Sequence, residues 1–316
     1  MEAMKRIFLN LFVMAVMLVV ADYSIGLLLR KVLESSPDGR YFKADYSLNK
    51  CNEDIIILGS SRAETNYAPF VFKESLKMSC WNTGRGGQTL PFWCAMEKGI
   101  LARYTPKIVV VNVESEFLSE NLKEGFERAG FLRPFYYENS EIRPIVNRIS
   151  SFEKFYLFSN IYAYNSSFYY LLRPYVLEDL DGRKEDNGWK ARENMIHTEK
   201  IELDILNSSR SINQETRELF EEFISDLKKS GSKVFVVISP DYGKLAVSTS
   251  TIEFITKMNG ITVLNFANNP GFSGNAKYFS DENHLNVEGA VRYSELVCNA
   301  IKSRDRMLGV HPLSTD

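Results

Sequence analysis

The fold of this chain is decided by residues 55–62, Ile55-Ile56-Ile57-Leu58-Gly59-Ser60-Ser61-Arg62. An unbroken run of branched apolar residues is typical of a parallel strand that is buried on both faces. Further apolar runs follow along the chain, and together they predict five strands, at 54–58, 78–82, 107–113, 233–239 and 261–266.

Helical patterns lie between several of these strands and after the last one. Residues 91–104, 213–230 and 287–302 each place apolar side chains on one face of a helix, and Gly231 is a stop signal. Strands that alternate with helices build βαβ units, so the sequence predicts an α/β fold with a mostly parallel five-stranded sheet and helices on both faces. We expect residues 54–306 to form this domain and residues 307–316 to form a tail.

The segment 118–212 interrupts the alternation, because it holds no strong strand pattern. From Phe131 to Tyr175, fourteen of forty-five residues are Phe or Tyr. One interpretation is a helical insertion that packs on the domain or lies near a membrane. The other is a lid or groove in which flat aromatic rings stack on sugars.

The N-terminus is predicted to be a membrane segment. The apolar run over residues 7–29 is long enough to cross a bilayer, which needs about 20 residues. Asp22 would be costly deep in lipid, so we expect it near the outer interface or against a partner. Lys5 and Arg6 precede the run, but Arg30 and Lys31 follow it and weaken the charge asymmetry that sets orientation.

These features predict an anchor over residues 1–33 and a polar linker over residues 34–53, with the remaining chain outside the cytoplasm, periplasmic or extracellular. The alternative is a secreted protein whose signal peptide is cleaved near Ala21.

Composition excludes other classes of protein. The net charge of −2 provides no general attraction to nucleic acid. The four cysteines and three histidines show no metal-ligand spacing, so we expect neither a metal nor a cofactor. Cys51 and Cys80 could form a disulfide in an exported domain, and buried free thiols are the alternative.

Three short motifs carry residues that could do chemistry. Gly59-Ser60-Ser61 follows the first strand at the edge of the sheet where ligands bind, although such a turn can also cap a helix or cradle a phosphate. The glycine-rich loop Asn82-Thr83-Gly84-Arg85-Gly86-Gly87 follows the second strand and is either a source of inward N–H groups or an ordinary turn. Asp281 lies three residues before His284, so it can orient the imidazole or merely cap the next helix.

Taken together, these motifs resemble those of the SGNH (GDSL-like) hydrolase superfamily. Its pattern is Gly-x-Ser after the first strand, Asn-x-Gly-x-x-Gly after the second, and Asp-x-x-His before the last helix. Ser60 in place of the usual aspartate, together with the anchor, resembles membrane-tethered branches such as DltD-like and alginate-O-acetylation-like proteins. The resemblance implies a three-layer, flavodoxin-like sandwich and acyl-ester chemistry, and it leaves the insertion at 118–212 unmatched.

The resemblance also implies roles for individual residues. Ser61 matches the nucleophile, His284 the general base and Asp281 its orienter, and the backbone N–H groups of Ser61 and Gly87 match oxyanion donors. Further oxyanion or substrate-binding positions carried over from the family are Gly86, Asn82, Arg62 and Ser115.

One family feature is missing. The family usually has an asparagine after the third strand as an oxyanion donor, whereas this chain has Ser115 or Glu116 there. A carboxylate cannot donate a hydrogen bond unless it is protonated, and the loss of one such donor typically costs about 10²–10³ in rate.

The sequence therefore predicts a serine-dependent acyl-ester hydrolase or O-acyltransferase that acts on an acylated carbohydrate of the cell envelope or another acyl ester. A membrane-bound acyltransferase is a candidate partner, and the membrane itself is bound through the N-terminal helix. The alternative is a non-catalytic exported protein that binds glycan or a membrane complex. A phosphate-binding module is a third interpretation, but it gives Asp281 and His284 no role.

Overall fold

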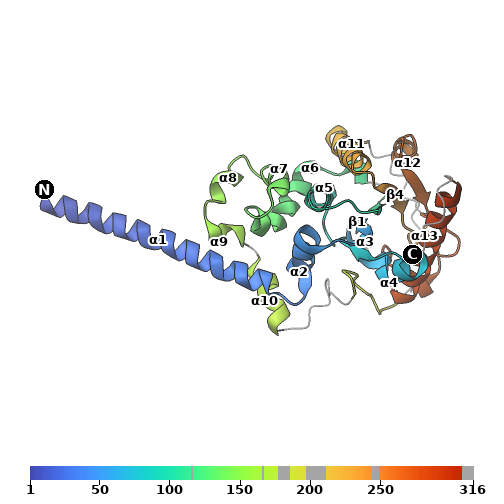
Figure 1. The fold of residues 1–316 in the computed structure, drawn as a ribbon, viewed down its shortest axis with the longest axis horizontal. Coiled ribbons are helices and arrows are strands. Elements are labelled where there is room, and N and C mark those ends of the chain that lie inside the picture. Colours follow the sequence, from blue (N-terminus) through green and yellow to red (C-terminus); the bar gives the residue numbers. More distant parts are fainter. Residues whose placement is uncertain (115–116, 166, 177–185, 197–210, 244–248, 308–316) are drawn as a thin grey trace.

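A sheet of five parallel strands lies at the centre of the computed structural model, which describes residues 1–114, 117–165, 167–176, 186–196, 211–243 and 249–307 (Figure 1). Each strand is one or two residues shorter than the run that predicted it. The α/β class and the parallel sheet are thus confirmed. The strands are β1 (Ile55–Leu58), β2 (Cys80–Asn82), β3 (Ile108–Val113), β4 (Lys233–Ile238) and β5 (Thr262–Asn265).

The order of the strands is β2-β1-β3-β4-β5, so the chain changes direction across the sheet after β2. The carboxyl ends of β1 and β3 are neighbours at this reversal, with Leu58 paired to Val111. Ligands in open parallel sheets bind at such a reversal, outside the carboxyl ends of the strands. The residues that follow β1 and β3 are therefore placed at the sheet edge suited to a site.

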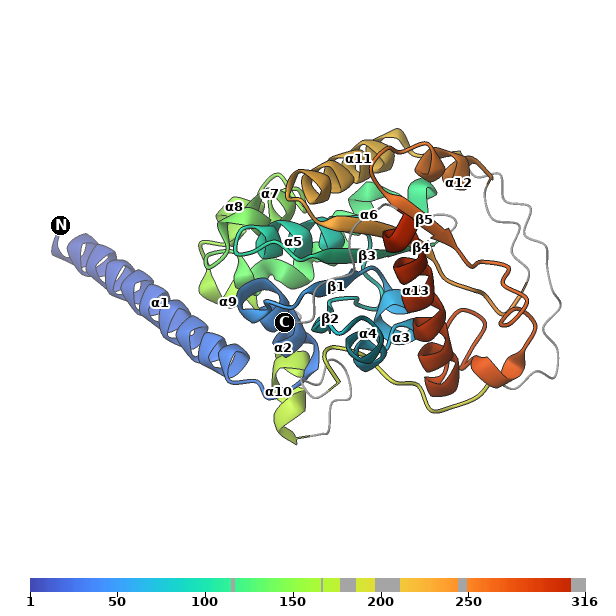
Figure 2. The ribbon, with the colours of Figure 1, turned by 45° about the vertical axis from the view of Figure 1, so that its right-hand side comes forward.

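Alternate strand residues enter two separate hydrophobic clusters. Ile56 and Val109 point into the first cluster, and Ile57 and Val110 point into the second, as the period of two in a strand requires. Both faces of the sheet are covered in this way, which explains the continuous apolar runs (Figure 2). The first cluster includes α5 (Leu90–Leu101), α11 (Gln214–Lys229) and α12 (Thr249–Thr256), and the second includes α3 (Ser61–Asn66), α4 (Pro69–Leu76) and α13 (Val287–Met307).

The segment 34–53, predicted to be a linker, is part of the folded domain. Residues 39–45 form α2 (Gly39–Asp45), which continues into a π-helical turn (Tyr46–Lys50). Tyr41, Ala44 and Leu48 are buried in the first cluster, and the Trp81 indole donates a hydrogen bond to Ser47 at 2.9 Å. The prediction was wrong because these three apolar residues have helical spacing but are separated by polar ones.

Between β3 and β4, the described residues form helices and no strand. The inner side chains of this insertion, such as Phe126, Phe135 and Leu157, join the first cluster. The segment therefore packs on the domain. Its α-helices are α6 (Leu122–Arg128), α7 (Arg143–Val146), α8 (Glu153–Tyr156), α9 (Asn160–Ala163) and α10 (Phe168–Val176), and 3-10 turns lie at Phe117–Ser119, Ala129–Phe135 and Ser140–Ile142, with another at Ala276–Tyr278 before α13.

The N-terminal apolar run is a single helix, α1 (Glu2–Glu34), which is long and apolar enough to cross a membrane. Its first part projects from the domain (Figure 1). Its last part packs against the domain, where Gly26, Leu29 and Leu33 are buried. The helix contacts α9, α2 and α10.

Cys51 and Cys80 are both buried free thiols, which is the alternative to the disulfide that the sequence left open. Burial raises the pKa of each thiol. We therefore expect both cysteines to be unreactive.

Glu97 is an unusual core residue, because its side chain on α5 is 1% exposed and neither carboxyl oxygen has a hydrogen-bond partner among the described residues. Burial raises its pKa from 4.5 to about 8. The contribution of this carboxyl to stability is fully present below its unfolded pKa and is lost as pH rises through the folded one.

We expect Glu97→Gln, which mimics the protonated acid, to be more stable than the unchanged chain in alkali. The gain in free energy of unfolding should grow from near zero at about pH 4.5 to on the order of 4 kcal/mol at about pH 9. Urea unfolding of the full chain in detergent across this pH range measures the difference. If the free energies of unfolding of the two chains differed by the same amount at every pH, the prediction of a raised Glu97 pKa would be contradicted.

Candidate active site

Ser61 is the first residue of α3 and lies directly beyond the carboxyl end of β1. The turn between them requires Gly59, whose φ is +147°. A Cβ at this position would lie 2.9 Å from the backbone oxygen of Asn112 and 2.7 Å from the Ala63 side chain. The tight turn brings Ser61 to the sheet edge at the reversal between β1 and β3.

His284 lies on a tight turn that is closed by an antiparallel bridge between Phe279 and Leu285. The Asp281 carboxylate holds this turn, because its Oδ1 accepts the backbone N–H groups of Asn283 and His284, both at 2.9 Å. The same carboxylate contacts His284 Nδ1 at 2.7 Å. Asp281 therefore both shapes the turn and orients the imidazole.

The serine and the histidine meet. His284 Nε2 lies 2.7 Å from Ser61 Oγ, although the two residues are 223 positions apart in the chain. In this arrangement the imidazole can accept the hydroxyl proton while the carboxylate fixes the ring.

The Asp281 carboxylate has the charge that this arrangement needs. Burial would raise its pKa, but the hydrogen bond from His284, the backbone N–H of Asn283 and the charges of His284 and Arg192 together hold the pKa below its ordinary value. Arg192 Nη1 donates to Asp281 Oδ2 at 2.7 Å. The carboxylate thus stays ionised over the neutral range.

A buried arginine fastens the two parts of the site together. Arg62, the residue after Ser61, makes two hydrogen bonds to Asp241, one of them at 2.8 Å, and donates to Asn283 Oδ1 at 3.0 Å. Burial would lower the pKa of Arg62, but the charges of Asp241 and Glu114 raise it. Arg62 was predicted to bind substrate or an oxyanion, whereas its guanidinium is engaged in joining α3 to the His284 loop.

Asn66 makes a second connection between the same elements. Its Oδ1 accepts the backbone N–H of Leu285 at 2.9 Å, one residue beyond His284. Asn66 is fully buried at the end of α3. Both ends of α3 are therefore fixed to the loop that carries the imidazole.

The glycine-rich loop lies beside Ser61, since a Cβ on Gly86 would lie 3.6 Å from the Ser61 Cβ. Asn82 is fully buried and holds the loop, accepting the Gly84 N–H at 2.9 Å and donating to backbone oxygens of Ala63 and Tyr67. Asn82 thus acts on the loop rather than on a substrate.

The N–H groups of the two predicted donors in this loop differ. The Gly86 N–H donates to Glu64 Oε2 at 2.9 Å, so it is already used. The Gly87 N–H has no acceptor among the residues that the structure describes, and its φ of +73° suits glycine. Lys43 of α2 bonds both Glu64 and the Gly84 carbonyl and so braces the loop.

The end of β3 has no asparagine in the donor position. Asn112 lies inside β3, is fully buried, and accepts the Tyr67 hydroxyl at 2.7 Å. Glu114 follows the strand and accepts a hydrogen bond from the Ser60 hydroxyl. Ser115, the predicted donor, lies outside the described residues.

A pocket of about 510 Å³ adjoins the Asp281–His284 side of the site. One wall comes from residues 194–196, beyond the aromatic segment of the insertion, and the other from residues 280–284. A substrate could reach the imidazole from this pocket.

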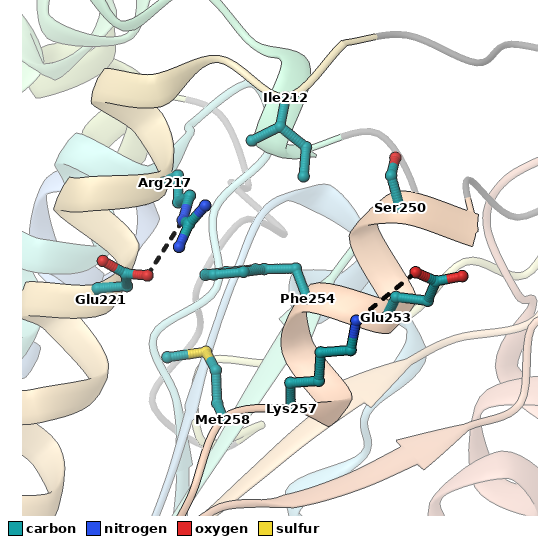
Figure 3. Close-up of a pocket in the computed structure, with 8 residues that line it drawn as sticks. All are labelled: Ile212, Arg217, Glu221, Ser250, Glu253, Phe254, Lys257 and Met258. Carbon is teal, nitrogen blue, oxygen red and sulfur yellow. Dashed lines mark hydrogen bonds and ion pairs between the residues drawn. The ribbon is translucent and has the colours of Figure 1, made fainter.

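A second pocket, of about 480 Å³, lies between α11 and α12 and contains none of the residues above (Figure 3). Its charged side chains pair locally, Arg217 with Glu221 within α11 at 3.1 Å and Lys257, just after α12, with Glu253 at 3.8 Å. Among the described residues, no group of His, Cys, Asp and Glu side chains could hold a metal ion.

Sequence reasoning missed several supporting residues. Asp241 could have been suspected, because it follows β4 at the same sheet edge as Ser61. Asn66 and Arg192 carry no local signal, because their partners are distant in the chain.

A comparison with protein-family models gives no match, and a comparison with curated proteins gives no relative of this chain. The geometry is therefore the basis for assigning a function.

Two arginines of this site differ in burial and so predict different effects on stability. The side chains of Arg62 and Asp241 are only 10% and 4% exposed, whereas those of Arg192 and Asp281 are 28% and 43% exposed. Arg62→Ala leaves a buried carboxylate without its partner and should lower the free energy of unfolding by about 3–5 kcal/mol. Arg192→Ala should cost about 1 kcal/mol or less.

Urea unfolding of both variants in detergent makes the comparison. As a further control, Arg62→Met combined with Asp241→Leu should recover much of the lost stability, because no charge is left buried. Equal losses for the two single variants would contradict a larger contribution of the buried Arg62 pair to stability.

Proposed function

We propose that this chain is a serine-dependent acyl-ester hydrolase or O-acyltransferase that acts on O-acylated envelope glycan. The observation that carries the proposal is the 2.7 Å contact between Ser61 Oγ and His284 Nε2, with Asp281 on the opposite ring nitrogen at 2.7 Å. A nucleophile, a base and an orienting carboxylate in this order define the acyl-transfer arrangement on many unrelated folds.

In the first half of the reaction, His284 accepts the hydroxyl proton while Ser61 Oγ attacks the ester carbonyl. The tetrahedral intermediate collapses as the imidazolium returns the proton to the leaving alcohol, and the acyl group remains on Ser61. Asp281 stabilises the imidazolium that exists between these two steps. In the second half, His284 deprotonates water or a sugar hydroxyl, which takes the acyl group from Ser61.

The backbone N–H groups of Ser61 and Gly87 are our candidates for the oxyanion site. Ser61 is the first residue of α3, where an N–H has no partner within the helix. The Gly86 N–H is excluded because Glu64 accepts it. Two backbone donors without a side-chain donor predict modest turnover.

We also propose membership of the SGNH superfamily and its three-layer sandwich. The order of the motifs along the chain, the 2-1-3-4-5 order of the sheet and the two clusters on its faces support this assignment. The missing asparagine after β3 sets this chain apart from the usual pattern.

A glycan is the preferred substrate because of the resemblance to envelope-acylation proteins and the proposed export of the domain. His284 precedes α13, which lies at the end of the molecule opposite α1 (Figure 1). A domain that extends away from α1 suits a polymer outside the membrane better than an ester within it. Hydrolysis and transfer use the same residues and differ in whether water or a sugar binds as acceptor.

We propose that α1 is retained as an anchor, with the domain outside the cytoplasm. Leu18 and Val19, which precede the alternative cleavage position at Ala21, already border the α8–α9 segment within a continuous helix. Arg30 is paired with Glu34 and Glu138 at 2.8 and 3.0 Å. The Arg30 charge is therefore balanced within the domain and weakens the charge asymmetry across α1 less. Lys5 and Arg6 then mark the cytoplasmic end of the helix.

A non-catalytic glycan-binding protein on the same fold is the second candidate. The observation that favours it is the loss of two donors, since Glu64 accepts the Gly86 N–H and no asparagine side chain follows β3.

The neighbouring serines allow a matched test of catalysis. Ser61→Ala should lower hydrolysis of a chromogenic acetyl ester by about 10³-fold or more and abolish labelling by a fluorophosphonate probe. Ser60→Ala, which removes only the bond to Glu114, should retain labelling. Equal labelling of the two variants would remove Ser61 from the mechanism, and no labelling of the unchanged chain would favour the binding protein.

Retention of the anchor predicts the mass of the mature protein. Intact-mass measurement of the chain purified from membranes should give a species that still contains residues 1–21. Loss of these residues would favour the secreted alternative.

A further inference from the structure

The last part of α1 packs against the domain. A Cβ added at Gly26 would lie 2.3 Å from the Asn160 Cβ, so the backbone of α1 lies directly against the start of α9. The Tyr175 hydroxyl of α10 donates to the Val32 carbonyl at 2.8 Å. The direction of α1 therefore fixes the orientation of the domain.

Asp22 has its partner within this contact. Its two oxygens accept four hydrogen bonds, from the Ser159 hydroxyl at 2.6 Å, the Asn160 backbone and side chain at 2.7 and 3.0 Å, and the Ile161 N–H at 3.2 Å. A carboxylate that is satisfied by donors of its own chain needs little water. Asp22 can therefore lie at a lipid boundary.

The length of the apolar run places that boundary. Residues 7–21 rise about 22 Å as a helix, whereas a hydrocarbon core is roughly 30 Å thick. With Lys5 and Arg6 at the inner side, the outer boundary of a bilayer of ordinary thickness falls near Gly26, beyond Asp22. Thinning of the bilayer would bring the boundary to Asp22 itself. In both cases the α8–α9 segment lies at lipid level.

The side chains of this segment suit such a position. Phe152, Phe155, Tyr156 and Phe158, which we call the aromatic rim, are between 48% and 76% exposed. The last three border a groove of about 780 Å³, whose other wall is formed by Leu18, Val19 and Tyr23 of α1. Asp22, Ser159 and Asn160 also line this groove and bond to one another, so the rim and the apolar side chains of α1 border the same groove.

The charges of α8 agree with this placement. Its one acidic side chain, Glu153, is buried and paired with Arg133, while Lys154 is exposed beside the rim. Tyr is enriched at membrane interfaces, Phe is common on the buried face of interfacial helices, and a basic residue there meets lipid phosphates.

We propose that the aromatic rim inserts into the interfacial layer of the bilayer that α1 spans, so that the domain is seated on the membrane at a fixed orientation. The inference requires α1 to be retained, but it is independent of the chemistry at Ser61. The aromatic rim would contact lipid in the region between the headgroups and the upper acyl chains.

Tryptophan scanning tests this arrangement in the full chain. Phe158→Trp and Phe155→Trp are reconstituted in nanodiscs of anionic phospholipid brominated on the upper acyl chains. Leu18→Trp in α1 is the positive control, and Phe70→Trp on α4, an exposed aromatic at the far end of the domain, is the negative control. Trp81, Trp93 and Trp189 are buried, so the unchanged chain supplies the background.

We expect both rim variants to lose about half or more of their added emission to the brominated lipid, as Leu18→Trp does, and Phe70→Trp to lose about a tenth or less. Rim variants that behave like Phe70→Trp while Leu18→Trp is quenched would overturn the proposal and leave the rim as a surface for a protein partner. Fluorophosphonate labelling of Ser61 in the same samples separates this outcome from failure of the proposed function.

Discussion

The buried ion pair between Arg62 and Asp241 is the interaction on which the rest of the site depends. Arg62 adjoins Ser61 in the chain, and its bond to Asn283 reaches the turn that carries His284. Ser61 and His284 come from opposite ends of the sequence, so nothing local keeps them in contact. A charged residue with little exposure must keep its partners, because breaking such a pair leaves a charge in a poor solvent. That requirement helps to hold α3 against the turn that carries His284.

Much of the fold and the central pair of the site could be predicted because the signals are local. The isoleucine run of β1 and the valine run of β3 are buried on both faces, and Asp281 contacts His284 within one turn. What could not be predicted depends on contacts between distant segments. The supporting roles of three residues arise only when distant loops come into contact, namely those of Asp241, Asn66 and Arg192. Asn82 has the right position for a donor, but its side chain is already hydrogen-bonded to backbone groups.

The aromatic insertion and the apolar helix are one structural unit. Asp22, which is an anomaly in the sequence of a membrane segment, becomes the acceptor that caps α9. The short helices of the insertion bury their inner residues on the domain and leave their outer aromatics beside α1. A long insertion between β3 and β4 is then explained by support of the anchor at one end of the domain and by a wall of the pocket near His284 at the other.

The burial of α2 decides where the chain can be shortened for work in solution. A truncation that begins at the first strand would remove Lys43, which braces the loop beside Ser61, and Leu48, which is fully enclosed. Such a fragment would expose core surface and would leave the loop beside Ser61 without this support. A fragment that begins just before Gly39 keeps both residues but loses Leu29 and Leu33 from the first cluster, so a shortened chain must also keep the buried end of α1.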